Sequence, residues 1–107
     1  MKRQLVKERR ALEDLADQVD YYVERELFTV ADEFISAFEN FCELVIHQPE
    51  MAHLFEAENA RLRALELRIW PLGHRYPHLV FYYLTDTEIR IYAVLHGHMD
   101  LGEALDD

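Results

Sequence analysis

The apolar residues in the last third of the chain follow the spacing of β-strands. Residues 65–70 and 88–96 alternate between apolar and polar side chains, whereas residues 79–84 are apolar or aromatic throughout. Alternation is typical of a strand with one covered face, and an unbroken apolar run is typical of a strand covered on both faces. We therefore predict three strands, with 79–84 in the centre. The Thr-Asp-Thr sequence at 85–87 favours a tight turn, which makes the last two strands an antiparallel hairpin.

The alternation also predicts which side chains share a side of the sheet, since neighbours in a strand point to opposite sides. In residues 65–70, Leu65, Leu67 and Ile69 would point to one side, and Glu66, Arg68 and Trp70 to the other. In residues 88–96, Ile89, Ile91, Ala93 and Leu95 would point to one side, and Arg90, Tyr92, Val94 and His96 to the other. We expect Arg68 and Arg90 to occupy outward positions.

Apolar residues in the first half of the chain recur at spacings of three and four, which is typical of amphipathic helices. This spacing predicts one helix at about 9–26 and a second at about 30–46, with Thr29 as N-cap of the second and Pro49 after its end. The apolar face of the first helix would consist of Leu12, Leu15, Ala16, Val19, Tyr22 and Val23. That of the second would consist of Ala31, Phe34, Ile35, Phe38, Phe41, Cys42 and Val45.

The order of these elements predicts one α+β domain over residues 1–107. We expect a helical hairpin packed on one side of a small antiparallel sheet, in the order β-α-α-β-β-β, with the opposite side free to meet another protein. Residues 2–7 fit an edge strand, and an earlier start of the first helix is the alternative. Residues 50–60 are ambiguous, and residues 101–105 have apolar positions at helical spacing.

Composition and charge limit the function. Cys42 is the only cysteine, so no internal disulfide can form and we expect a cytoplasmic location. We expect neither a signal peptide nor a membrane span, because no apolar run approaches the roughly 20 residues that a spanning helix needs. The net charge is −10, with −8 in residues 1–60 and +2 in residues 61–98. Nucleic-acid-binding proteins usually carry a basic excess, so we expect no direct nucleic-acid binding.

Few residues point to catalysis. Ser36, the only serine, and Cys42 both fall inside the second predicted helix, where we expect structural roles. His96 and His98 have a spacing that can chelate a metal, but it fixes no third ligand, and we expect neither a metal nor a cofactor. RNA cleavage would need a cation and a proton acceptor, for which the candidate catalytic residues are Arg68, Arg75, His96 and His98. The alternative is that Arg68 and Arg90 provide solubility and pair with Glu66 or Glu88.

Five sequence features follow one another along the chain in a recognisable order. They are A-x-x-F-x-x-A-F at 31–38, Pro49, L-x-L-R-I-W at 65–70, Y-P-H-L-V-F-Y-Y at 76–83 and I-R-I-Y-A-V-L-H-G at 89–97. From about Leu5 to Leu101 the chain resembles the RelE/ParE toxin superfamily, and most closely the ParE-like, or plasmid-stabilisation, toxins. That family commonly ends its last strand in H-G-x-R-D, where this chain has His98 in place of the arginine.

The resemblance implies a toxin of a type II toxin–antitoxin system, held inactive in a hetero-oligomer by a cognate antitoxin encoded next to it. ParE-like toxins inhibit DNA gyrase; the alternatives are a RelE-like ribosome-dependent mRNA endoribonuclease and a non-toxic member that only binds its antitoxin. The candidate target-binding residues are Arg68, Trp70, Arg90, Tyr92, His96 and His98. The candidate antitoxin-binding residues are Leu12, Leu15, Val19, Tyr22, Phe81 and Tyr83.

Overall fold

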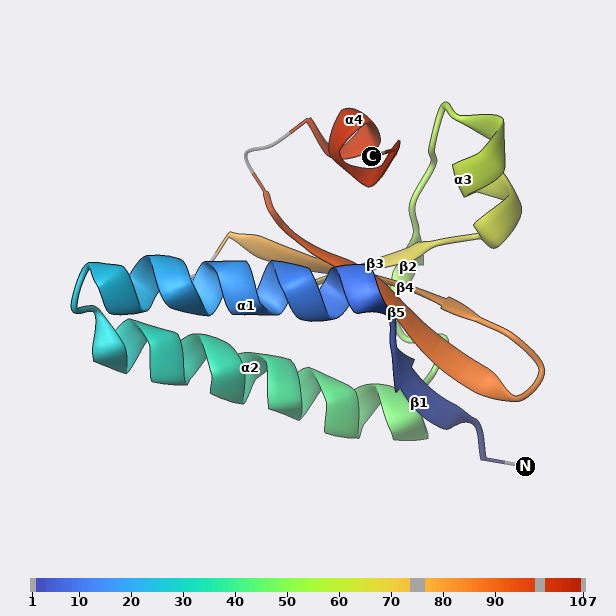
Figure 1. Ribbon diagram of the computed structural model, residues 1–107. Helices are drawn as coiled ribbons and strands as arrows, with labels where there is room; N and C mark the ends of the chain where they lie inside the picture. The colour runs from blue at the N-terminus through green and yellow to red at the C-terminus, as the bar shows by residue number, and fades with distance from the viewer. Residues whose placement is uncertain (1, 74–76, 98–99, 107) are drawn as a thin grey trace.

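The computed structural model describes residues 2–73, 77–97 and 100–106 (Figure 1). Its elements are β1 (Gln4–Lys7), α1 (Arg9–Glu24), α2 (Phe28–His47), β2 (His53–Leu54), α3 (Ala60–Leu65), β3 (Arg68–Pro71), β4 (His78–Leu84), β5 (Glu88–His96) and α4 (Leu101–Asp106). The predicted α+β class is confirmed. Within the described parts of the chain, no helix is both long enough and apolar enough to cross a membrane.

The five strands form one sheet in the order β1-β5-β4-β3-β2, so β4 is central as predicted. The β4–β5 hairpin is also confirmed. The Thr85 N–H donates to the Glu88 carbonyl over 2.9 Å, and the Thr85 hydroxyl accepts from the Glu88 N–H over 2.9 Å. The edge strand in residues 2–7 is present as β1, and it pairs with β5 in parallel, whereas all other pairs are antiparallel.

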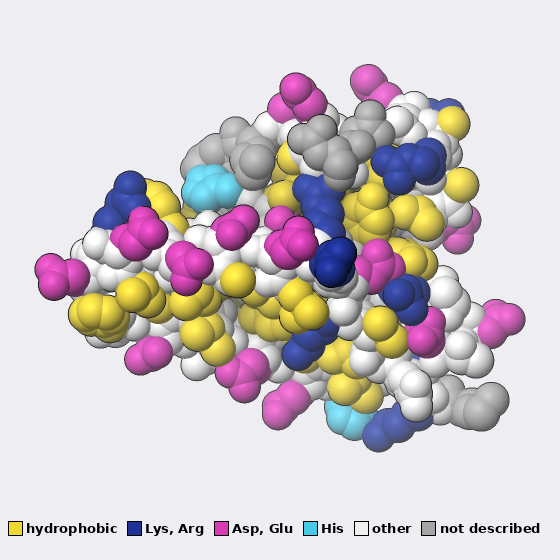
Figure 2. Space-filling model, viewed as in Figure 1, with side chains coloured by type: hydrophobic (Ala, Val, Ile, Leu, Met, Phe, Trp, Pro, Cys, Tyr) yellow, Lys and Arg dark blue, Asp and Glu magenta, His cyan; other side chains and the backbone are white. Residues whose placement is uncertain are grey.

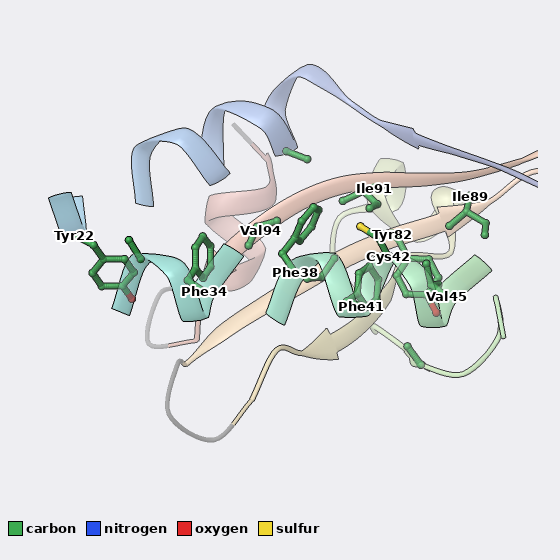
Figure 3. Packing of buried hydrophobic residues seen from close by; sticks show 14 residues of the cluster. Tyr22, Phe34, Phe38, Phe41, Cys42, Val45, Tyr82, Ile89, Ile91 and Val94 are labelled. Carbon is green, nitrogen blue, oxygen red and sulfur yellow. The ribbon is translucent and has the colours of Figure 1, made fainter. Parts of the chain in front are cut away.

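The helical hairpin covers one side of the sheet and buries the larger core, which we call the first core (Figure 3). Phe41 of α2 packs edge-on against Tyr82 of β4, with 5.6 Å between the ring centroids. The first core consists of Ala11, Tyr22, Ala31, Phe34, Phe38, Phe41, Cys42, Val45, Ala52, Val80, Tyr82, Ile89, Ile91 and Val94. Burial raises the pKa of the Cys42 thiol to about 11, which makes this cysteine a packing residue, as its place in the helix pattern predicted.

The opposite side of the sheet is not free, contrary to our prediction. Helices α3 and α4 lie over it (Figure 1) and bury a second core against the sheet. This second core consists of Ala57, Leu62, Leu67, Phe81, Ala93, Leu95 and Leu105. The Arg10 guanidinium donates to the carbonyls of Ala104 and Leu105, so α1 also helps to hold α4 in place.

The prediction of a strand from residue 65 was wrong at its start. Leu65 is the last residue of α3, and Glu66 follows in the left-handed conformation with φ 57° and ψ 53°, so β3 begins only at Arg68. The Asn59 side chain caps the beginning of α3 by accepting from the N–H groups of Arg61 and Leu62. Similarly, α2 begins at Phe28 with no side-chain cap, so Thr29 is not its N-cap.

A bulge in β5 overturns part of the predicted side assignment. Tyr82 lies opposite Ile91, but Phe81 lies opposite Ala93, so β5 has one extra residue between these pairs. Tyr92 and Ala93 therefore both pack on the second-core side. Beyond the bulge the predicted sides are exchanged, with Val94 in the first core and Leu95 in the second.

Asp14 supports the edge of β5 beyond the point where β1 ends. Its carboxylate accepts a hydrogen bond from the Val94 N–H over 3.0 Å and lies 3.7 Å from the Arg10 guanidinium. Burial raises the pKa of this carboxyl, and the Val94 hydrogen bond partly opposes the shift. We expect Asp14→Ala to lower the free energy of unfolding by about 1–3 kcal/mol, because the Val94 N–H loses its partner. Chemical denaturation measures this, with the exposed Asp17→Ala as control; equal effects would contradict the role of Asp14.

Candidate partner-binding surfaces

An exposed apolar strip runs along the outer boundary between α1 and α2. We call it the hairpin strip; it consists of Leu12, Val19, Val23, Phe28 and Ile35. Leu12 is 50% exposed, Val23 44%, Phe28 57% and Ile35 38%. The α1 members are spaced seven and four apart and the α2 members seven apart, so each set lies on one side of its helix. Figure 2 shows hydrophobic side chains gathered along this boundary.

Acidic side chains border the hairpin strip on both helices. Residues 9–47 contain three Arg and ten Asp or Glu, for a net charge of −7. Helical spacing places Asp20 beside the α1 part of the strip, and Asp32 and Glu39 beside the α2 part. In Figure 2 acidic side chains lie above and below the hydrophobic ones. The hairpin therefore presents an apolar line between negatively charged borders.

The predicted antitoxin-binding residues are not all on one surface. Leu12 and the half-buried Val19 belong to the hairpin strip, and Leu15 is half-buried beside it. Tyr22 is buried in the first core, while Tyr83 packs on the other side of the sheet. Phe81 is fully buried in the second core, so it is a packing residue and offers no surface to a partner.

Sequence patterns missed part of the strip. Ile35 was expected in the buried face of the second helix, and Phe28 was left outside that helix. Because α2 begins at Phe28, this residue is part of the helix and lies on the same side of it as Ile35. Their spacing of seven is the signal that could have joined them, since seven residues make about two helical turns.

The predicted target-binding residues are divided between the two sides of the sheet. The Arg68 guanidinium donates to the Glu50 carbonyl over 3.3 Å and to the Ala52 carbonyl over 2.8 Å. Trp70 packs against the first core, whereas Tyr92 packs against the second. His96 stacks edge-on against His78, with 5.3 Å between centroids. His98 and Arg75 lie outside the described residues.

Arg90 is held in a polar cluster on the second-core side. It donates to the Glu8 carboxylate over 2.9 Å and to the Glu88 carboxylate over 2.8 Å. The Tyr83 hydroxyl donates to the same Glu8 oxygen over 2.6 Å, and burial together with Glu8 raises the pKa of that hydroxyl. The expected pairing of Arg90 with Glu88 is thus confirmed. The carboxylates of Glu8 and Glu88 compensate the charge of Arg90, so this guanidinium is poorly suited to bind a phosphate.

The described members of the candidate endoribonuclease set do not converge. Arg68 lies opposite Tyr82 and His96 lies opposite His78 across β4. Four residues along a strand separate these positions, or about 13 Å. Acid–base catalysis needs its groups within hydrogen-bond reach of one reacting centre. This arrangement therefore provides no ribonuclease site among the described residues.

His78 is buried at the beginning of β4, next to a groove between α1 and β5. It is 2% exposed, and neither ring nitrogen has a hydrogen-bond partner among the described residues. The Phe34 ring lies 4.7 Å away. Burial, assisted by His96, lowers the pKa of His78 to about 4. The described residues contain no cluster of three or more potential ligands that could hold a metal ion.

Comparisons with known proteins agree with this fold. A solved structure of the chromosomal ParDE TA system from P. aeruginosa superposes with a TM-score of 0.69 at 18% identity, covering 89% of this chain and 96% of that chain. None of the curated proteins matches the sequence. The family profile "ParE toxin of type II toxin-antitoxin system, parDE" matches residues 5–101. Since this match covers nearly the whole chain, the protein belongs to the ParE toxin family of type II toxin–antitoxin systems.

Proposed function

We propose that this protein is a non-enzymatic toxin that inhibits DNA gyrase and is held inactive by a cognate antitoxin encoded next to it. The observation that carries the proposal is the family match over residues 5–101, supported by a fold similar to that of a solved ParDE structure. The absence of converging catalytic groups among the described residues favours an action through protein contacts over an enzymatic one.

The endoribonuclease alternative has less support. Arg68 hydrogen-bonds to backbone carbonyls and Arg90 to two carboxylates, so neither cation is available for a phosphate. The second-core side of the sheet is covered by α3 and α4. The groove between these helices is lined by four carboxylates, those of Glu56, Glu58, Asp100 and Glu103, which would repel RNA.

The antitoxin would bind the hairpin strip. A contiguous line of exposed apolar residues is unusual on a monomeric protein and marks an interaction site. Binding there would form the hetero-oligomer expected for this family without disturbing either core.

A gyrase supercoiling assay with the purified chain tests the proposal. We expect the protein to block supercoiling of relaxed plasmid, and the product of the adjacent open reading frame to restore it. Circular dichroism provides the control that the protein is folded. A folded protein without effect on gyrase would contradict the proposal and favour a non-toxic member that only binds its antitoxin. Cleavage of mRNA in a translation extract would favour the endoribonuclease.

A further inference from the structure

We propose that the hairpin strip binds a basic amphipathic helix, with apolar residues on one face and Lys or Arg beside them. This inference rests on the proposed function, because the occupant would be a segment of the antitoxin. It goes further by specifying the charge and conformation of that segment from the surface that receives it.

The dimensions of the strip fit a helix. From Leu12 to Val23 the α1 part extends over eleven steps along the helix, or about 16 Å. Phe28 and Ile35 are exposed and lie seven residues apart on one side of α2, and Figure 2 shows hydrophobic side chains along the boundary between α1 and α2. A partner helix of about 15 residues would be about 22 Å long and would present apolar residues at every third or fourth position to this line.

The hydrogen bonding of the hairpin also favours a helical occupant. The backbone groups of α1 and α2 are engaged within their own helices, so this surface offers no strand edge to an extended peptide. An extended segment lying on it would bury backbone groups without partners. In a helix the backbone N–H and C=O groups hydrogen-bond to one another, so a helix can bury its apolar face without leaving backbone groups unpaired.

The charge of the hairpin selects a basic occupant. Residues 9–47 carry a net charge of −7. Helical spacing places Asp20 beside the α1 part of the strip, and Asp32 and Glu39 beside the α2 part. Lys or Arg on the flanks of the bound helix would face these carboxylates and speed association. A second copy of this chain is a poor occupant, because its own hairpin carries the same negative charge.

Two synthetic peptides test the inference. One is a helical peptide of about 15 residues with Leu on one face and Lys or Arg on its flanks; the other replaces every Lys and Arg by Glu. Fluorescence anisotropy measures their affinities for the full chain in low and high salt. We expect the basic peptide to bind at least about tenfold more tightly than the acidic one, and this preference to shrink in high salt.

Variants of the chain locate the binding. We expect Ile35→Glu to lower the affinity for the basic peptide at least about tenfold, because the substitution places a charge among the apolar residues of the hairpin strip. Leu54→Glu is the matched control, since Leu54 is 55% exposed on β2 and away from the hairpin. If Ile35→Glu does not fold, Val23→Glu replaces it as the test variant and should weaken binding of the basic peptide in the same way. Asp20→Lys combined with Asp32→Lys should reverse part of the preference toward the acidic peptide.

The outcomes separate this inference from the proposed function. Equal binding of both peptides, or no effect of Ile35→Glu and Val23→Glu, would overturn the inference. If the adjacent gene product binds through the strip but carries an acidic segment there, the inference fails while the proposed toxin–antitoxin pairing stands. If the basic peptide binds selectively but the chain leaves gyrase unaffected, the surface stands and the proposed toxin activity fails.

Discussion

Phe81→Ala is expected to lower the free energy of unfolding by about 3–5 kcal/mol, measured by chemical denaturation. Phe81 is fully buried in the central strand and meets Phe55 edge-on, with 5.3 Å between ring centroids. It is the largest side chain in the second core, whose other members are Leu or Ala. Because this core is small and is covered by two short helices, few neighbouring side chains can shift to fill the cavity.

Leu54→Ala provides the comparison. It removes an apolar side chain that is 55% exposed, so the free energy of unfolding should change by about 0.5 kcal/mol or less. A loss of stability below about 1 kcal/mol for Phe81→Ala would mean that α3 and α4 do not bury the second core as described.

Long segments with a clear period were predictable from the sequence. The helices α1 and α2 and the strand β5 span 9–20 residues each, so their apolar spacing repeats often enough to identify them, and β4 was identified by its unbroken apolar run. The strand β2 has two residues and the helix α3 has six, which is too short for a period to emerge. The wrong expectation of a free sheet side arose because α3 was missed and because the helical spacing at residues 101–105 did not show that α4 packs on the sheet.

The bulge in β5 explains why the side assignment failed where the strand assignment succeeded. The register between β4 and β5 shifts between Phe81 and Tyr82, and a single extra residue after Ile91 exchanges the sides of the rest of β5. The sequence between Ile91 and Val94 contains neither Gly nor Pro to mark this point. Val94 and His96 were therefore expected beside Arg90, although Val94 belongs to the first core.

The partners of the candidate site residues could not be inferred from local spacing. The parallel pairing of β1 with β5 brings Glu8 to Arg90, 82 residues away. Arg68 was expected beside Glu66 but instead bonds to the carbonyls of Glu50 and Ala52. Such contacts depend on how distant elements meet, and they convert residues that looked like free surface cations into structural ones.

Acidification between pH 6.5 and about 4 is expected to destabilise the fold by about 3 kcal/mol through His78 alone. The folded pKa of His78 is about 4, below the ordinary value of 6.5. In this pH range the unfolded chain binds a proton that the folded chain excludes, so the free energy of unfolding falls as the pH falls. Well above pH 6.5 His78 is neutral in both the folded and the unfolded chain, so the stability is undiminished there; the loss begins as the pH falls through 6.5. Tyr22, Phe34 and His96 surround the ring, and none of these three carries a negative charge that would stabilise the protonated form.

Denaturation curves from pH 7 to 4 for the wild type and His78→Leu isolate this effect. Leucine has a similar volume and cannot titrate, so the loss of stability with acid should be smaller by about 3 kcal/mol in the variant. At pH 7 the variant should be at least as stable, because it removes two buried ring nitrogens that lack partners among the described residues. The exposed His53→Leu is the matched control and should keep the dependence caused by His78. Parallel curves for wild type and His78→Leu would show that the His78 ring is accessible to protons in the folded state.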